Sequence, residues 1–322
     1  MRYRTLGKTG LSVSEIGFGG WEIGGDSAKG FGPADESDSL LALNAAYDAG
    51  CTFFDTADVY GYGQSERLIA KALKGWQRDR VTIASKVGMD FSEALSNPSK
   101  EPHPLFSQAH LERACEESLK RLGVEAIDLY QLHTPSLALI QAGHIFQVLK
   151  NLKAQGKIRF YGISIHDPQE GIQAISVGEV DCVQVAINLF GQRPLEALLD
   201  CCRENNIGLI AREALAQGFL SGRFDIEEPL CANDVRAVWP KPLRQRRLLA
   251  SEKFLPLLDK MLPYPGLYAL ALRYGLSFPE VSTVLAGSKN AHHTRENMAA
   301  ADLEPLSRAG LESIQAIQKT LL

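Results

Sequence analysis

Short apolar runs alternate with longer amphipathic stretches along most of the chain. The apolar runs have the length of buried strands, and the stretch after each of them repeats its apolar residues at helical spacing. We predict strands at Ile16–Gly19, 52–54, 81–85, 127–132, 158–163, 181–186, 207–211 and 282–285. We predict helices at 37–49, 65–74, 108–122, 138–154, 168–177, 194–205, 265–275, 291–299 and, as the last element, 307–320.

This regular order of strands and helices predicts the architecture. Repeated strand-helix units imply a parallel sheet with right-handed crossovers, and eight units suggest an α/β protein that closes into a (β/α)₈ TIM barrel. We expect residues 1–322 to form one such domain, preceded by an N-terminal β-hairpin at the Lys8-Thr9-Gly10 turn. The alternative is a doubly wound open sheet. It predicts a GxGxxG turn and a helix directly after the first strand, which Gly17, Gly19 and Gly20 match only in part.

Three connections between the predicted elements are long, at 21–36, 87–106 and 219–250. Each of them follows a predicted strand, so a barrel would place all three at the C-terminal rim, where barrels carry their active-site loops. Long ordered loops at one rim usually form lids or pocket walls.

Composition narrows the class of protein. Of 322 residues, 45% are hydrophobic, which is enough for a large core, and the net charge of −4 comes from charges of both signs spread along the chain. Such a distribution favours neither a nucleic acid nor a membrane as partner. The six cysteines are scattered without a CxxC pair, which argues against a disulfide framework or a metal site and fits a cytoplasmic protein.

Three of the apolar strands end in a polar residue: Asp55, Lys86 and His133. In a barrel these ends meet at one mouth, and Tyr60 follows Asp55 in a glycine-containing loop. Taken singly, the four have ordinary explanations as a strand-end cap, a surface lysine, a structural histidine and a packing tyrosine. Their joint placement favours one catalytic set in a shared pocket.

The four side chains suit the reduction of a carbonyl group. Hydride transfer puts negative charge on the carbonyl oxygen, which then needs a proton. A tyrosine with a pKa near 10 is a weak acid, and an adjacent ammonium such as that of Lys86 lowers this pKa. Asp55 would keep Lys86 charged inside the pocket, and His133 would donate a hydrogen bond to the substrate oxygen.

The motifs around these residues resemble those of the aldo-keto reductase superfamily. The similarity lies in DTADVYGYGQSE, TIASKVG, DLYQLH and the preceding LERACEESLKRLGVEAID, and it extends from Arg4 to about Leu303. The resemblance implies a (β/α)₈ barrel with an N-terminal hairpin. It also implies an NADP-dependent oxidoreductase that transfers a hydride between NADPH and an aldehyde or ketone, with Tyr60 as general acid.

The segment GSKNAHHTREN lies between the last barrel strand and its helix. A helix N-terminus offers free N–H groups to a phosphate, although the plain alternative is an ordinary helix start capped by Asn290. The resemblance implies that Ser288 and Lys289 hold the 2′-phosphate of NADP. Beside the adenine it places His293, Glu296 and Asn297. Lys289 stands where many relatives have arginine, which predicts a less bidentate contact, but we still expect NADP rather than NAD.

The resemblance also assigns residues to the rest of the dinucleotide and to the substrate. Ser164 and Gln184 match contacts to the nicotinamide amide, where Ile165 replaces the usual asparagine. Arg212 falls at a position that often stacks an aromatic ring on the nicotinamide. The residues that match the stretch around the pyrophosphate are Leu215, Gln217 and Gly218, of which Leu215 could equally be core packing. Trp21 falls near a residue that lines the substrate pocket.

Two other functions remain open at this stage. Lys86 could be the Schiff-base nucleophile of a barrel aldolase, which requires a neutral amine. Alternatively, the chain could be a regulatory or binding subunit that holds NADP and turns over slowly, as in the potassium-channel accessory branch of the family. The oligomeric state cannot be read from the sequence.

Overall fold

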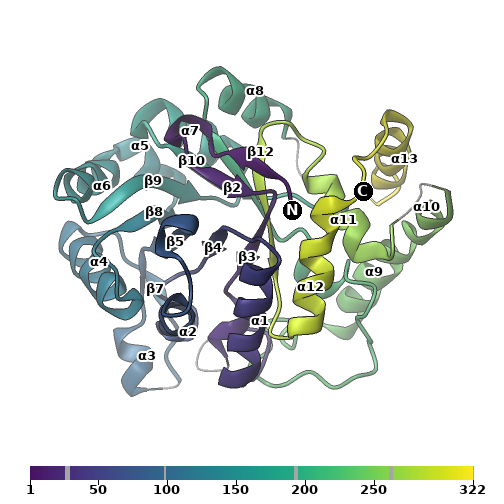
Figure 1. Ribbon diagram of the computed structural model, residues 1–322, viewed down its shortest axis with the longest axis horizontal. Helices are drawn as coiled ribbons and strands as arrows, with labels where there is room; N and C mark the ends of the chain where they lie inside the picture. Colours follow the sequence, from purple (N-terminus) through teal and green to yellow (C-terminus); the bar gives the residue numbers. More distant parts are fainter. Residues whose placement is uncertain (26–29, 98, 192–194, 261–263, 322) are drawn as a thin grey trace.

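Eight parallel strands close into a barrel at the centre of the protein (Figure 1). The structure is a computed structural model that describes residues 1–25, 30–97, 99–191, 195–260 and 264–321. In chain order the barrel strands are β3 (Ile16–Gly19), β4 (Phe53–Asp55), β5 (Thr82–Val87), β8 (Ile127–His133), β9 (Ile158–Ser164), β10 (Cys182–Ala186), β11 (Gly208–Arg212) and β12 (Val281–Gly287). Because β12 pairs with β3, the sheet has no free edge. The predicted (β/α)₈ barrel is confirmed.

A helix follows each barrel strand and covers its outer face. These helices are α1 (Glu36–Asp48), α2 (Gln64–Leu73), α4 (Gln108–Leu122), α5 (Leu137–Ala142), α6 (His144–Ala154), α7 (Pro168–Gly178), α8 (Glu196–Glu204), α11 (Leu267–Gly275) and α12 (Ala291–Ala299), with α13 (Arg308–Gln318) as the last. The helix predicted at 138–154 is in fact two, because Gly143 adopts a left-handed φ of 76° that ends α5. Residue 194, the predicted start of another helix, lies outside the described residues.

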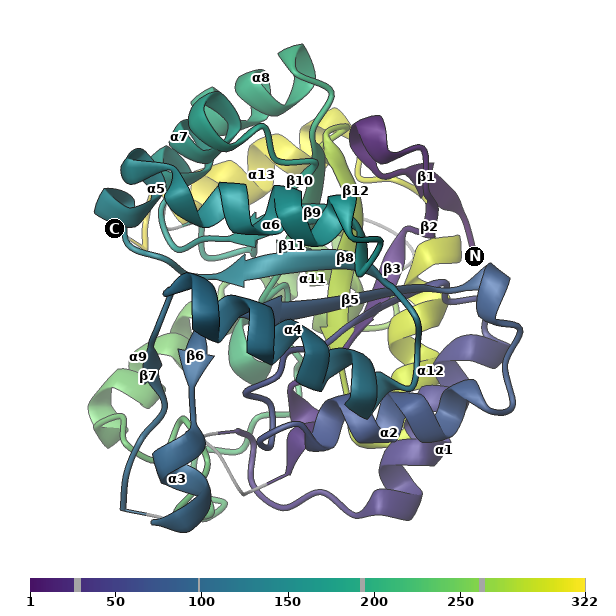
Figure 2. The ribbon, with the colours of Figure 1, turned by 90° about the vertical axis from the view of Figure 1, so that its left-hand side faces the viewer.

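The N-terminal hairpin is also confirmed, and it closes one end of the barrel. Its strands β1 (Tyr3–Thr5) and β2 (Ser12–Ser14) are antiparallel. Leu6 and Val13 are fully buried and pack against barrel residues such as Phe53. This contact leaves the C-terminal ends of the strands, at the opposite end of the barrel, to carry a site (Figure 2).

The three long connections contain more regular structure than predicted. The first holds the short helix η2 (Glu22–Gly24). The second holds a hairpin of β6 (Met89–Asp90) and β7 (His103–Pro104), with α3 (Ser92–Ser96) between them. Of these connections, residues 26–29 and 98 lie outside the described part.

The third connection was predicted as a loop over 219–250, but it ends in helix α9 (Lys241–Glu252), followed by α10 (Leu255–Lys260). A proline lies in the first turn of α9. Proline suits this position, because a backbone N–H in the first turn would have no acceptor within the helix and its absence costs no hydrogen bond. Gly30 pairs with Asp234 in an isolated bridge. The first and third connections therefore meet.

Candidate active site

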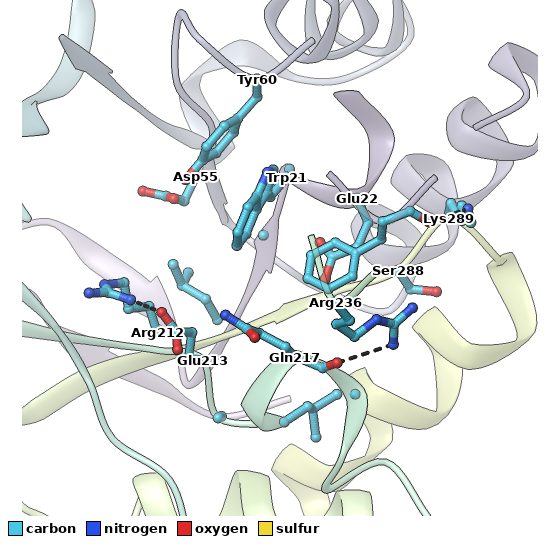
Figure 3. Close-up of a pocket in the computed structure, with 18 of the residues that line it drawn as sticks. Trp21, Glu22, Asp55, Tyr60, Arg212, Glu213, Gln217, Arg236, Ser288 and Lys289 are labelled. Carbon is cyan, nitrogen blue, oxygen red and sulfur yellow. Dashed lines mark hydrogen bonds and ion pairs between the residues drawn. The ribbon is translucent and has the colours of Figure 1, made fainter. Parts of the chain in front are cut away.

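A cavity of about 850 Å³ opens at the C-terminal end of the barrel. Strand ends form its floor and the long connections form its walls. Figure 3 shows Tyr60 and Asp55 toward one end, Ser288 and Lys289 toward the other, and Trp21 and Glu22 between them. The volume lies in the upper part of the range for small-molecule sites, so an elongated ligand has room here.

The predicted catalytic residues lie together at the floor of this cavity. Asp55 and His133 are the last residues of β4 and β8, and Lys86 is next to last in β5. Lys86 is 1% exposed, and its ammonium forms an ion pair with the Asp55 carboxylate. The same nitrogen donates hydrogen bonds to the Thr56 carbonyl at 2.9 Å and to the Tyr60 hydroxyl at 3.3 Å. Asp55, Tyr60 and His133 line the cavity, whereas Lys86 lies beneath it.

Rings on two sides and a tight turn hold Tyr60 in place. Its ring stacks on that of Trp21 with centroids 6.0 Å apart, and it meets the His133 ring edge-on at 5.9 Å. The next residue, Gly61, has a φ of 59°, and a Cβ there would overlap the Gly24 carbonyl. Glycine at 61 therefore lets the loop pack closely enough to place the Tyr60 hydroxyl at Lys86.

Gln131 in β8, which was not among the residues predicted from the sequence, is a further member of this network. Its side-chain amide donates to Asp55 Oδ2 at 3.0 Å, and the Gln184 amide donates to the same oxygen at 2.8 Å. Gln184 also donates to Gln131 Oε1 at 3.2 Å. The signal was present in the sequence: Gln131 precedes His133 by two residues in an apolar strand, so both side chains point to the same face.

Burial and neighbouring charges set the protonation states of the set. Burial acts to lower the pKa of Lys86, but nearby Asp55 and Tyr60 outweigh it, and the pKa is raised. Burial, helped by the Lys86 charge, holds the pKa of His133 well below its usual value. We therefore expect a charged lysine and a neutral histidine at pH 7.

The pKa of Tyr60 is shifted in the direction opposite to the one predicted from the sequence. Burial raises its pKa above the usual 10, and the Lys86 charge, which acts in the opposite direction, does not overcome this effect. The reason is that the lost hydration of a tyrosinate costs more free energy than one ammonium recovers, since that ammonium is already paired with Asp55.

All six residues assigned to the nicotinamide and pyrophosphate also line the cavity: Ser164, Gln184, Arg212, Leu215, Gln217 and Gly218. The backbone after β11 is unusual, because Glu213, Ala216 and Gln217 all have positive φ angles, of 55°, 45° and 57°. Non-glycine residues adopt such angles at a cost, and they gather at ligand sites. Turns of this kind can aim successive N–H groups at an anion.

Arg212 is held against the cavity wall by three partners. Its guanidinium donates to the Ile165 carbonyl at 2.9 Å, approaches His166 Nδ1 at 3.2 Å and forms an ion pair with Glu213. These contacts fix the plane of the guanidinium beside the floor of the cavity.

At the far end, Ser288, Lys289, His293 and Asn297 line the cavity, while Glu296 does not. Glu296 instead forms an ion pair at 2.5 Å with Arg223, which does line it. Lys289 Nζ donates to the Phe31 carbonyl at 3.0 Å. The Asn290 side chain caps α12 by accepting from two backbone N–H groups, as the plain alternative predicted.

The cavity has unmet hydrogen-bonding capacity along its length. Four buried atoms of lining residues have no hydrogen-bond partner among the described residues: His133 Nδ1, Arg212 Nε, Gln217 Oε1 and Asn297 Oδ1. Buried polar atoms are nearly always paired, so a polar ligand that extends from the catalytic residues to α12 would complete them. The described residues include no cluster of metal-ligating side chains, and their cysteines are all free thiols. None of the described helices could span a membrane.

Comparisons with known proteins agree with this description. Residues 15–319 match the model of the aldo/keto reductase family. Aldo-keto reductase YhdN of Bacillus subtilis is 33% identical over 90% of this chain and 85% of its own length. The NADH-specific methylglyoxal reductase of Escherichia coli is 28% identical over 94% of both chains. The solved glycerol dehydrogenase AKR11B4 of Gluconobacter oxydans superimposes with a TM-score of 0.82 at 26% identity, covering 100% of this chain and 95% of its own.

The barrel and the cavity at its C-terminal end define a class, the (β/α)₈ barrels that carry a small-molecule site at this end. Within that class the chain belongs to the aldo/keto reductase family. Proteins of this family act on carbonyl substrates with a nicotinamide cofactor.

Proposed function

We propose that this protein is an NADP-dependent reductase that transfers a hydride between NADPH and an aldehyde or ketone. One observation carries the proposal: the Tyr60 hydroxyl lies 3.3 Å from a buried lysine ammonium, at the floor of a cavity of about 850 Å³ that reaches Lys289. A proton donor and a fixed positive charge are the two groups that carbonyl reduction needs from the protein.

A nicotinamide cofactor, when bound here, would supply the hydride, and the part of the protein would be to stabilise the negative charge that develops on the carbonyl oxygen. Tyr60 donates its proton to that oxygen. Lys86 remains an ammonium beside the tyrosinate, and Asp55, with two glutamine amides on its other oxygen, keeps Lys86 in place. The raised pKa of Tyr60 keeps the hydroxyl protonated at neutral pH, so the donor form is populated before substrate binds.

His133 would position the substrate. Burial lowers its pKa, so the imidazole is neutral and has one N–H to donate. A neutral donor can hold the carbonyl oxygen near Tyr60 without adding a second full charge beside Lys86.

The same pKa directions oppose the aldolase alternative. A Schiff-base lysine must be neutral to attack a carbonyl, yet Asp55 and Tyr60 raise the pKa of Lys86. We expect no borohydride-trapped adduct between Lys86 and a carbonyl substrate.

The direct test is NADPH oxidation by the purified protein with a panel of aldehydes and ketones. We expect turnover with at least part of the panel, because the four proposed catalytic side chains already contact one another. A protein that binds NADPH tightly but oxidises none with any of these compounds would instead be a binding or regulatory subunit.

Selectivity for NADP is a separate prediction, since one relative is an NADH-specific enzyme. Lys289 lies at the end of the cavity opposite Tyr60 (Figure 3). Its ammonium is tethered to the Phe31 carbonyl. We expect Lys289→Ala to raise the Kd for NADPH about tenfold more than the Kd for NADH, as for a lost charge-assisted phosphate contact. Both constants can be measured by quenching of protein fluorescence.

Lys289→Arg is the matched control and should keep the preference for NADPH. Equal changes in the two Kd values on Lys289→Ala would show that Lys289 does not contact the 2′-phosphate.

A further inference from the structure

Glu22 places a carboxyl group in the middle of the cavity wall. It begins η2, directly after Trp21, and its side chain is half-buried. In Figure 3 it lies between Trp21 on the side of Tyr60 and Ser288 on the side of Lys289. Glu22 has no part in the proposed catalytic steps or in the predicted cofactor contacts.

The structure makes room for this carboxyl group. Gly287, the last residue of β12, lies directly against both carboxylate oxygens, and a Cβ at 287 would overlap them. Any larger residue at 287 would displace Glu22. The carboxyl group is therefore seated on the strand end from which the Ser288-Lys289 segment begins.

The nearest positive charges are already paired with other groups. Arg236 and Lys289 both act on Glu22 electrostatically, yet neither forms an ion pair with it in the described part of the chain. Arg236 forms two hydrogen bonds to the Asp234 carboxylate, at 2.8 and 2.6 Å, and donates to the Gln217 carbonyl at 3.2 Å. Lys289 is tethered to the carbonyls of Phe31 and Pro33.

Burial of the carboxyl group therefore dominates its protonation state. It raises the pKa of Glu22 to about 7, while a hydrogen bond from the residue's own backbone N–H and, to a smaller extent, the two cations act in the opposite direction. The other charged or titratable groups around this part of the cavity are His293 on α12, the Arg223–Glu296 pair and, behind Arg236, Asp234. The pKa of His293 is lowered by burial, so His293 is neutral at pH 7.

An anionic ligand that extends from Tyr60 to Lys289 has to pass this carboxyl group. Gln217 and Arg236, which also line the cavity, lie on the other side of this passage in Figure 3. An ionised Glu22 would repel a diphosphate there, whereas a protonated Glu22 would donate a hydrogen bond to a phosphate oxygen or a ribose hydroxyl.

We propose that Glu22 couples cofactor binding to the uptake of one proton, so that the nicotinamide dinucleotide binds only to the form with a neutral Glu22 carboxyl group. This inference rests on the proposed function, because it assumes that the dinucleotide occupies this cavity. The proton comes from solvent as the cofactor binds and returns to solvent on release. No other bond changes.

The sign of the pH effect follows from linkage. Below about pH 7 the free protein already carries the proton, so binding takes up none and affinity does not depend on Glu22. Above about pH 7 the carboxylate must first be protonated, so the Kd rises toward a limiting slope of about tenfold per pH unit.

The test is the Kd of NADPH and of NADH between about pH 6 and pH 9 for the wild-type protein and Glu22→Gln, which keeps the shape but cannot ionise. We expect the ratio of the wild-type Kd to the Glu22→Gln Kd to be close to one at low pH and to rise with pH above about pH 7. Titration of the cofactor phosphate and of His293 affects both proteins, so it cancels in their ratio. Calorimetry in two buffers of different ionisation enthalpy then counts the protons: close to one for wild type at high pH, and none for the variant.

Glu228→Gln is the matched control, because Glu228 lines the same cavity as an exposed carboxylate. It should keep the wild-type slope. Glu22→Ala removes the carboxyl group altogether, and its Kd should depend on pH in the same way as that of Glu22→Gln.

Two results would overturn the proposal. One is an equal pH slope in wild type and Glu22→Gln. The other is weaker binding by Glu22→Gln at every pH, as expected if an ionised Glu22 accepts hydrogen bonds from the ribose. In both cases cofactor still binds, so the proposed function stands. If neither cofactor binds wild type at any pH, the proposed function and the inference fail together.

Discussion

Replacing Tyr60 with phenylalanine is expected to lower kcat for carbonyl reduction by about 10²–10⁴-fold, the usual contribution of a placed general acid. The substitution removes one hydroxyl and keeps the ring. The packing against Trp21 and His133 should survive, since both contacts involve the ring alone. Lys86 loses a single hydrogen bond of 3.3 Å and keeps Asp55 and the Thr56 carbonyl.

The measurement is steady-state NADPH oxidation together with the Kd for NADPH. We expect the Kd to be unchanged, because the hydroxyl acts on the substrate oxygen and not on the cofactor. Tyr62→Phe is the matched control: it lies in the same loop, and its ring stacks on Phe91 away from the catalytic residues. A Tyr60→Phe enzyme with a near-normal kcat would rule out Tyr60 as the proton donor.

Replacing Lys86 with methionine is expected to destabilise the protein by about 3–5 kcal/mol, the usual effect of removing one partner of a buried ion pair. Asp55 is 2% exposed and would keep only the two glutamine amides. Urea unfolding measures the change. The exposed pair of Lys71 with Glu36 is the control, because Lys71→Met should cost less than about 1 kcal/mol.

The loss in Lys86→Met should come from the Asp55 carboxylate that it leaves buried without a cation. Adding Asp55→Asn, which removes that charge and keeps the shape of the side chain, should restore part of the stability at neutral pH. A double variant no more stable than Lys86→Met would mean that the stranded charge is not the cause of the loss.

The repeat of apolar strand and amphipathic helix determined the barrel from the sequence alone. The reason is that a parallel strand buried on both faces reads as a short apolar run, and a crossover helix reads as a 3.6-residue period. The polar residue at the end of each of three such strands could be placed on one rim, because all parallel strands point the same way. The positions of Asp55, Lys86 and His133 could therefore be predicted without knowing any side-chain contact.

Only the tertiary structure decided what those residues meet. That two glutamines share one oxygen of Asp55 depends on the register between strands far apart in the chain, which no local pattern encodes. The direction of the Tyr60 pKa depends on how much water the folded loops exclude, so charge counting alone gave the opposite sign. Glu22 lies beside Gly287 only because the first and last barrel strands pair to close the sheet. The sequence determines which groups reach the rim, and closure of the barrel determines which of them touch.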